Sequence, residues 1–174
     1  IGNLANLVNR TLTFLTRYFD GVVPERSDDE VERSSFWKDV RAEEAAITER
    51  LEWAGLRDAF RTVFALSSYG NRVFQGAEPW KTRKTDPEGT HALLGDLVYL
   101  IRDLAVLIEP YIPATAERLR RMLGVETLSW NDIGSPRGLT TIGTPEILFE
   151  QLSDELIGEM RRRFSGSQAE RAAR

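Results

Sequence analysis

The chain has 174 residues and a formal net charge of −4, with 41% hydrophobic and 29% charged residues. This length suffices for one ordinary domain with a sizeable core, and this composition excludes global disorder. The negative charge argues against a protein that coats nucleic acid by bulk electrostatics, but it is compatible with a small basic site. The sequence contains no cysteine, which excludes disulfides and thiol chemistry and agrees with a cytoplasmic location.

Few features of the sequence point to catalysis or to a metal. The only histidine, His91, has no serine or carboxylate near it in a recognisable arrangement, so we interpret it as an ordinary helix residue. One histidine without cysteine argues against a zinc site, and no glycine-rich phosphate loop is present. No apolar run approaches the roughly 18–20 residues that span a membrane. We therefore predict no catalytic residue, no metal site and no membrane partner.

Helical periodicity of the apolar residues predicts an all-α fold, with a bundle of about five helices. In chain order these helices are predicted at 2–19, at 35–53, from Gly55 to Pro79, at 88–109, and from Pro113 to Gly124. The apolar pattern of the first helix starts at the first residues without an N-cap, so we expect the chain to be part of a longer polypeptide.

The second predicted helix has two tryptophans, Trp37 and Trp53, as candidate core residues. The acidic run SDDEVE (27–32) comes just before this helix. We interpret the run as negative charge that favours the positive end of the helix dipole.

The character of the sequence changes after Gly124, where Gly, Pro, Ser and Thr become frequent. We predict a bundle over 1–124, a C-terminal extension over 125–164 that packs back on the bundle, and a flexible tail or linker over 165–174. The extension is expected to be irregular at first and to finish in a helix from Glu150 to about Phe164.

Four polar residues of the first helix, Asn3, Asn6, Arg10 and Arg17, fall within an arc of roughly 60° beside the apolar face. Asn6 and Arg10 are neighbours one turn apart. An amide offers a donor and an acceptor and a guanidinium offers a planar donor fork, a pair that suits the Watson–Crick edge of an unstacked base. The alternative is a polar face that meets only solvent or a neighbouring carboxylate.

A second candidate site is the stretch GAEPWKTRKTDPEG (76–89), which places Trp80 directly after Pro79 in a predicted loop. Three cations follow the tryptophan: Lys81, Arg83 and Lys84. Single-stranded RNA is bound by stacking bases on aromatic side chains, worth about 1–3 kcal/mol per base. The alternative is a tryptophan that caps the bundle core, with the cations extending around it into solvent.

The chain resembles the family of methionyl-tRNA synthetase anticodon-binding domains, within the class I aminoacyl-tRNA synthetases. The stretches that carry the resemblance are NLANLVNRTLTFLTRYFDGVVPE (3–25), GNRVFQGAEPWKTRK (70–84), LIEPYIPATAERLRRMLG (107–124) and LSWNDIG (128–134). TPEILFEQLSDE (144–155) is similar to the extension that follows in that family. The first-helix pattern and the EPW loop are the specific parts, since the rest would fit many helical bundles.

The resemblance implies that this domain binds the CAU anticodon loop of methionine tRNA. By motif match, Asn6 and Arg10 contact the first anticodon base, a cytosine, and Trp80 stacks on it. Pro79 fixes the loop of the tryptophan, and Asn71 matches a family asparagine near that site. Weaker candidates for RNA backbone contacts, argued from position and charge, are Arg17, Lys81, Arg83 and Lys84.

The family's catalytic signatures, of the HIGH and KMSKS types, are absent from this sequence, as is any cysteine for the zinc knuckle of the catalytic half. By resemblance, ATP, methionine and zinc belong to a catalytic domain of the same polypeptide, and this chain alone is no enzyme and holds no cofactor. The competing hypothesis is a helical scaffold that docks a protein partner, with Trp80 as an interface anchor.

Overall fold

A computed structural model describes residues 2–150 and 152–166 of the chain, and it has an all-α architecture there. The helices are α1 (Gly2–Phe19), α2 (Asp28–Arg33), α3 (Ser35–Glu52), α4 (Leu56–Ala77), α5 (Pro79–Thr82), α6 (Pro87–Ile108), α7 (Pro113–Leu123) and α8 (Asp154–Phe164). A 3-10 turn occupies Trp130–Asp132. The all-α prediction is confirmed. Most of the predicted tail, 167–174, lies outside the described residues.

The ends of the long helices follow from local backbone chemistry. At the end of α1, Asp20 and Gly21 take left-handed conformations with φ of 53° and 71°, which cannot continue a right-handed helix. Gly124 ends α7 in the same way with φ of 71°. Pro87 and Pro113 stand at the first positions of α6 and α7, where the missing N–H group is not needed.

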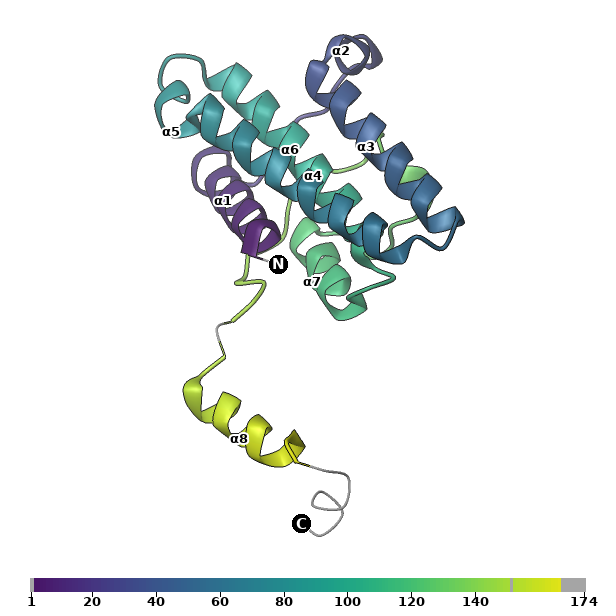
Figure 1. The fold of residues 1–174 in the computed structure, drawn as a ribbon. Coiled ribbons are helices and arrows are strands. Elements are labelled where there is room, and N and C mark those ends of the chain that lie inside the picture. The colour runs from purple at the N-terminus through teal and green to yellow at the C-terminus, as the bar shows by residue number, and fades with distance from the viewer. Residues whose placement is uncertain (1, 151, 167–174) are drawn as a thin grey trace.

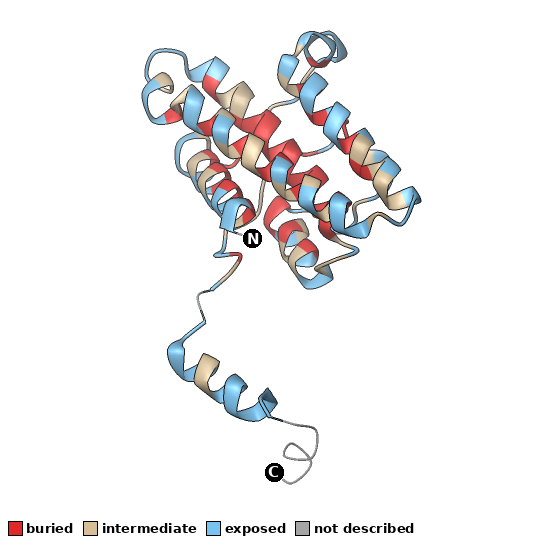
Figure 2. Ribbon diagram, in the orientation of Figure 1, coloured by how far each residue is buried: buried red, intermediate tan, exposed pale blue. Residues whose placement is uncertain are grey.

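Helix α6 is the centre of the bundle, with α1, α4 and α7 packed against it and α3 packed on α4. Residues 94–108 of α6 are buried without interruption. Its surrounding helices each bury a single stripe, drawn red on their inner sides in Figure 2. A helix that is apolar nearly all round belongs inside a bundle, whereas amphipathic helices cover it.

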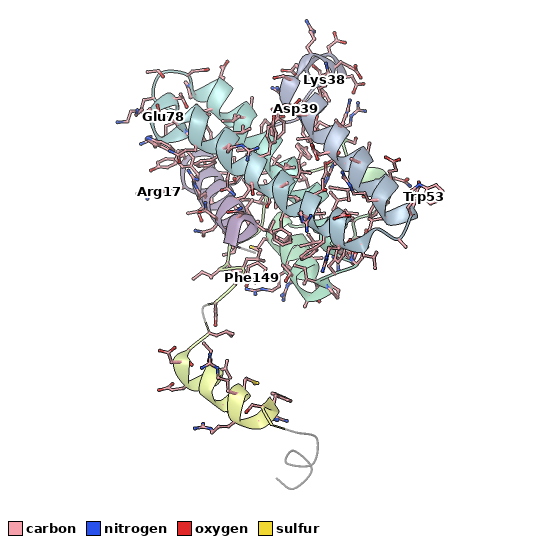
Figure 3. All side chains as sticks on the ribbon, in the orientation of Figure 1. Arg17, Lys38, Asp39, Trp53, Glu78 and Phe149 are labelled. Carbon is pink, nitrogen blue, oxygen red and sulfur yellow. The ribbon has the colours of Figure 1, made fainter. Side chains whose placement is uncertain are left out.

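Three local features differ from the sequence-based expectations. The acidic run is a separate helix, α2, which begins in a capping box formed by Ser27 and Glu30. Trp80 lies in the short helix α5 and not in an irregular loop. Trp53 is 82% exposed and lies in Figure 3 at the far end of the bundle from Arg17. It follows Leu51 by two residues, which turns it about 200° away from the buried stripe.

The C-terminal extension has two parts with different surroundings. Its first part contacts the bundle: Val23 N–H donates to the Thr140 carbonyl (2.9 Å), and Ile142 N–H donates to the Gly21 carbonyl (2.9 Å). Leu148 is buried in the same core. Helix α8 has no buried residue and stands apart from the bundle in Figure 1. The expected packing of the whole extension against the bundle is therefore seen only in its first part.

A buried ion pair fixes the middle of that first part, residues 130–139, which we call the strap. Arg102 donates from Nε to Asp103 Oδ1 (2.9 Å), and its Nη1 donates to the Arg137 carbonyl (2.9 Å). Asp103 Oδ2 accepts from the Gly134 N–H (3.0 Å). Glu44 of α3 lies buried beside this pair. Burial and then the negative charge of Asp103 raise the pKa of Glu44 to about 9.

Candidate nucleic-acid interface

A row of polar side chains joins α1 to α4, and we call it the polar seam. Asn3 Nδ2 donates to Ser68 Oγ (2.6 Å), and Asn6 Nδ2 donates to Asn71 Oδ1 (3.0 Å). The third bond runs from Arg10 Nη2 to Gln75 Oε1 (2.8 Å). Each bond joins residues 65 apart, so α1 and α4 run in the same direction. The polar arc predicted on the first helix thus faces α4.

Asn71 holds the centre of the seam in a fixed orientation. Its Nδ2 donates to the backbone carbonyls of Asn3 (2.6 Å) and Ser67 (3.1 Å), so its Oδ1 is the atom turned to Asn6. Among the described residues, Asn6 Oδ1 and four of the five Arg10 N–H groups have no hydrogen-bond partner. The seam therefore keeps the amide acceptor of Asn6 and several guanidinium donors of Arg10 for a ligand.

Beyond the seam, α1 and α4 open into a hollow of about 350 Å³. Its lining consists of Asn9, Arg10, Thr13, Phe14, Arg17, Tyr18, Phe74 and Trp80. The volume is within the range of small-ligand sites, and the lining combines aromatic faces with a few polar groups, as such sites do. Arg10 belongs to both the seam and the hollow. Asn6 and Asn71 lie one turn further along the seam, outside the lining.

Phe74 packs against two of the predicted site residues, Arg10 and Trp80. It is buried, and the Arg10 guanidinium carbon lies 4.3 Å from the centre of its ring. The Trp80 ring lies against the same phenylalanine, with 6.4 Å between ring centres and 35° between the planes. Burial lowers the pKa of the Arg10 guanidinium from its ordinary value. The group still carries its positive charge at neutral pH, as arginines in proteins do. The buried Phe74 ring therefore positions both the Arg10 guanidinium and the Trp80 indole in the lining of the hollow.

The backbone around α5 fixes Trp80 at the rim. Glu78 ends α4 in a left-handed conformation with φ of 46°, a strained arrangement for a residue other than glycine. Pro79 is buried and starts α5 at the position where a proline is best tolerated. Trp80 follows with 37% of its surface exposed. An indole held partly in water by a rigid turn is available for stacking.

The four candidate backbone cations have unequal surroundings. Arg17 lines the hollow, and in Figure 3 it lies at the same end of the bundle as Glu78. Arg83 stacks on the Tyr18 ring, with its guanidinium carbon 4.1 Å from the ring centre. Lys81 Nζ is exposed and pairs with Glu78 Oε1 at 2.7 Å. The fourth, Lys84, is exposed in the turn after α5 and is not part of the lining.

Phe74, Gln75 and Tyr18 are among the site residues that sequence reasoning missed. Phe74 and Gln75 precede the EPW motif by a few positions, and the four-residue spacing of Phe14 and Tyr18 marks a pair on one helix face. The rings of that pair lie 4.5 Å apart. Their partners lie on other helices, which a single-helix pattern does not reveal.

His91, which lies outside the hollow, makes structural contacts. His91 Nε2 lies 2.7 Å from the Val22 carbonyl and its ring stacks on Phe19 at 4.6 Å, an arrangement that joins α6 to the loop after α1. Over residues 2–150 and 152–166, no cluster of three or more potential metal ligands is found. None of the described helices is long and apolar enough to cross a membrane.

Comparison with known proteins gives a consistent result. The family model of the anticodon binding domain of methionyl tRNA ligase matches residues 23–169. A methionine–tRNA ligase of Treponema denticola is 40% identical, over 98% of this chain and 25% of that protein. One from Borrelia turicatae is 38% identical over 95% of the chain and 22% of that protein. The chain thus spans about a quarter of the length of these relatives.

The fold also matches a solved structure. The free-state methionyl-tRNA synthetase of Mycobacterium tuberculosis superposes with a TM-score of 0.72, at 22% identity, over 87% of this chain and 32% of that one. At this identity the likeness supports the fold alone.

Proposed function

The chain belongs to the family of methionyl-tRNA ligase anticodon-binding domains, and from this membership we propose that it binds the CAU anticodon loop of methionine tRNA. The observation that carries the proposal is the shared hollow of Arg10 and Trp80. It offers a stacking face and free polar groups to one unstacked base, which is how single-stranded RNA is read.

The first anticodon base stacks on the exposed face of Trp80 in this proposal. Phe74 supports the indole from the other side, and Pro79 limits the movement of its turn. A platform that is already in place loses little conformational freedom when the base binds. Stacking itself accepts any base, so the preference for cytosine must come from polar contacts.

Asn6 and Arg10 supply those contacts. Asn6 Oδ1 is an acceptor that has no partner among the described residues, and it suits the amino group of cytosine, which is a donor. Arg10 keeps N–H groups for an acceptor on the same edge. Uracil presents a carbonyl oxygen where cytosine has its amino group. An acceptor facing an acceptor leaves both groups unpaired and disfavours the wrong base.

We propose further that the whole protein is a methionine–tRNA ligase in which this domain selects the tRNA. The relatives that carry this name are about four times longer. ATP, methionine and zinc would be bound by a catalytic domain of the same polypeptide, which would be the second partner of this chain. The soluble anticodon domain would act with it in the cytoplasm.

The test is binding of the 174-residue chain to anticodon stem-loops, measured by fluorescence anisotropy of labelled RNA. We expect the CAU loop to bind more tightly than loops in which uracil or guanine replaces the first base. The Trp80→Leu variant should lose about 1–3 kcal/mol of binding free energy, the value of one stacked base. Equal affinity for all loops would overturn the proposal.

The matched control is Trp53→Leu, which removes an exposed tryptophan at the opposite end of the bundle. We expect this variant to bind RNA like the unchanged chain. The competing function, a scaffold that docks a protein partner, is favoured by the 82% exposure of Trp53. It predicts that neither tryptophan affects RNA binding.

A further inference from the structure

Tyr18 lies at the rim of the hollow between two guanidinium groups. The Arg83 guanidinium carbon is 4.1 Å from the centre of its ring, and that of Arg17 is 5.4 Å away. Tyr18 and Arg17 come from the last turn of α1, and Arg83 comes from the end of α5. One aromatic ring thus contacts two cations that are 66 residues apart in sequence.

Neither of these arginines forms an ion pair with a carboxylate in the described part of the chain. Asp20 follows Arg17 by three residues without pairing with it. Arg83 Nε is buried and lacks a hydrogen-bond partner among the described residues, so stacking on Tyr18 holds this side chain in place. Two uncompensated cations beside one hollow favour an anionic ligand.

Stacking also decides which atoms remain available. A guanidinium that lies over a ring keeps its N–H donors in its own plane, where they can bind the oxygens of a phosphate in a bidentate manner. The ring replaces a carboxylate as the positioning group, so the positive charge is retained. Lys81 offers the contrast within the same turn, because its ammonium group pairs with Glu78 at 2.7 Å.

We propose that Arg17 and Arg83, positioned by Tyr18, form a phosphate clamp for the RNA backbone next to the base that stacks on Trp80. The inference rests on the proposed function, because it takes the ligand to be the same anticodon loop. Trp80, Tyr18 and Arg17 line one hollow. A base on the indole therefore places its own phosphodiester groups within the reach of the two arginines. Lys81 has no part in this clamp.

The experiment uses the salt dependence of stem-loop affinity, because only phosphate contacts release counterions. Each lost contact to a single strand should reduce the slope of log K against log salt concentration by about 0.7. We expect this change for Arg17→Gln and for Arg83→Gln, with the preference for CAU unchanged in both. Arg57→Gln changes an exposed arginine in the first turn of α4, four residues after Trp53. It is the matched control and should keep the full slope.

Tyr18 is tested separately as a positioning residue. Tyr18→Phe keeps the ring and should behave like the unchanged chain. Tyr18→Leu removes the ring while both arginines remain, and we expect a smaller salt slope again. Circular dichroism verifies that the leucine variant is folded, and the two arginine variants keep the proposal testable without it.

A second measurement locates the phosphate. Neutral methylphosphonate groups on either side of the first anticodon base should weaken binding to the unchanged chain and have a smaller effect on Arg17→Gln, which keeps only the Arg83 contact. An undiminished salt slope in both arginine variants, with CAU still preferred, would overturn the clamp and leave the proposed function intact. Loss of all preference in the unchanged chain would overturn the proposed function, and the clamp with it.

Discussion

Two polar networks join segments of this chain, one between α1 and α4 and one between α6 and the strap, and they differ in their access to water. The polar seam between α1 and α4 is exposed, and Asn6 and Arg10 keep unused hydrogen-bonding groups. The ion pair of Arg102 and Asp103 is buried with both side chains almost fully bonded to each other and to the strap.

The difference shows how the same chemistry serves two purposes. A buried charge without a partner is very unfavourable, so the inner network must be complete in the folded chain and has nothing left for a ligand. In the seam, water satisfies whatever the protein leaves unpaired, and a ligand can replace that water. Changes to the inner network should therefore alter stability, and changes to the seam should alter recognition.

The largest effect is expected for Asp103→Asn. The substitution leaves the Arg102 guanidinium buried without its carboxylate, and we expect the free energy of unfolding to fall by about 3–5 kcal/mol. Urea denaturation measures this loss. Asp58→Asn is the matched control, since Asp58 pairs with Arg61 on the surface, and such pairs contribute about 0–1 kcal/mol. An equal loss of unfolding free energy in both variants would contradict the conclusion that the buried ion pair contributes more stability than an exposed one.

The next effect concerns Glu44 and depends on pH. Its pKa is about 9 in the folded chain against an ordinary 4.5, so the folded state holds a proton that the unfolded state releases. The stability contributed by this group is therefore full below about pH 4.5 and falls as the pH rises towards 9. Glu44→Gln removes the dependence, and we expect it to be more stable than the unchanged chain by about 1–3 kcal/mol at pH 9.

Thermal and urea unfolding between pH 5 and 9 test this sign. A loss of stability on Glu44→Gln at every pH would contradict it, because that result would mean that Glu44 is charged and stabilising. RNA affinity should not change with this variant, since Glu44 packs beside the strap and takes no part in the hollow.

The third effect belongs to the seam. Asn6→Ala removes the free amide acceptor, and we expect the discrimination between cytosine and uracil at the first anticodon base to fall by about 1–3 kcal/mol. Stability should change by less than about 0.5 kcal/mol, as is usual for exposed positions. Stem-loop affinities and urea denaturation of one protein sample measure both quantities. If Asn6→Ala lost stability but kept its discrimination between cytosine and uracil, Asn6 would have a structural role, like the buried ion pair, and no role in base recognition.

The helices could be predicted from sequence because each long helix carries its own apolar stripe. The two that were not predicted, α2 and α5, span only six and four residues, which is too short for a helical repeat to show. Trp53 was predicted in the core because tryptophan is usually buried. It lies about 200° from Leu51 and beyond the end of α3, where the chain turns at Ala54 with φ of 56°.

The candidate site could be predicted only in part, for a related reason. Trp80 and the polar arc of α1 are visible within single segments. The bond between Asn6 and Asn71, the contact of Phe74 with Arg10 and the contact of Arg83 with Tyr18 join α1 to segments 64–65 residues away. Such contacts depend on the relative direction and register of two helices, which helical periodicity does not specify.

The smallest effect is expected for Asn3→Ala, at the end of the seam away from the hollow. The substitution removes one exposed bond to Ser68 but keeps the Asn3 backbone carbonyl that orients Asn71. We therefore expect changes below about 0.5 kcal/mol in stability and no change in discrimination between cytosine and uracil. If Asn3→Ala weakened discrimination as much as Asn6→Ala does, the seam would act as one cooperative unit. The Asn3 side chain would then help to orient Asn6 through the neighbouring hydrogen bonds of the seam. An unchanged preference would assign base reading to Asn6 and Arg10 alone, where the seam meets the hollow.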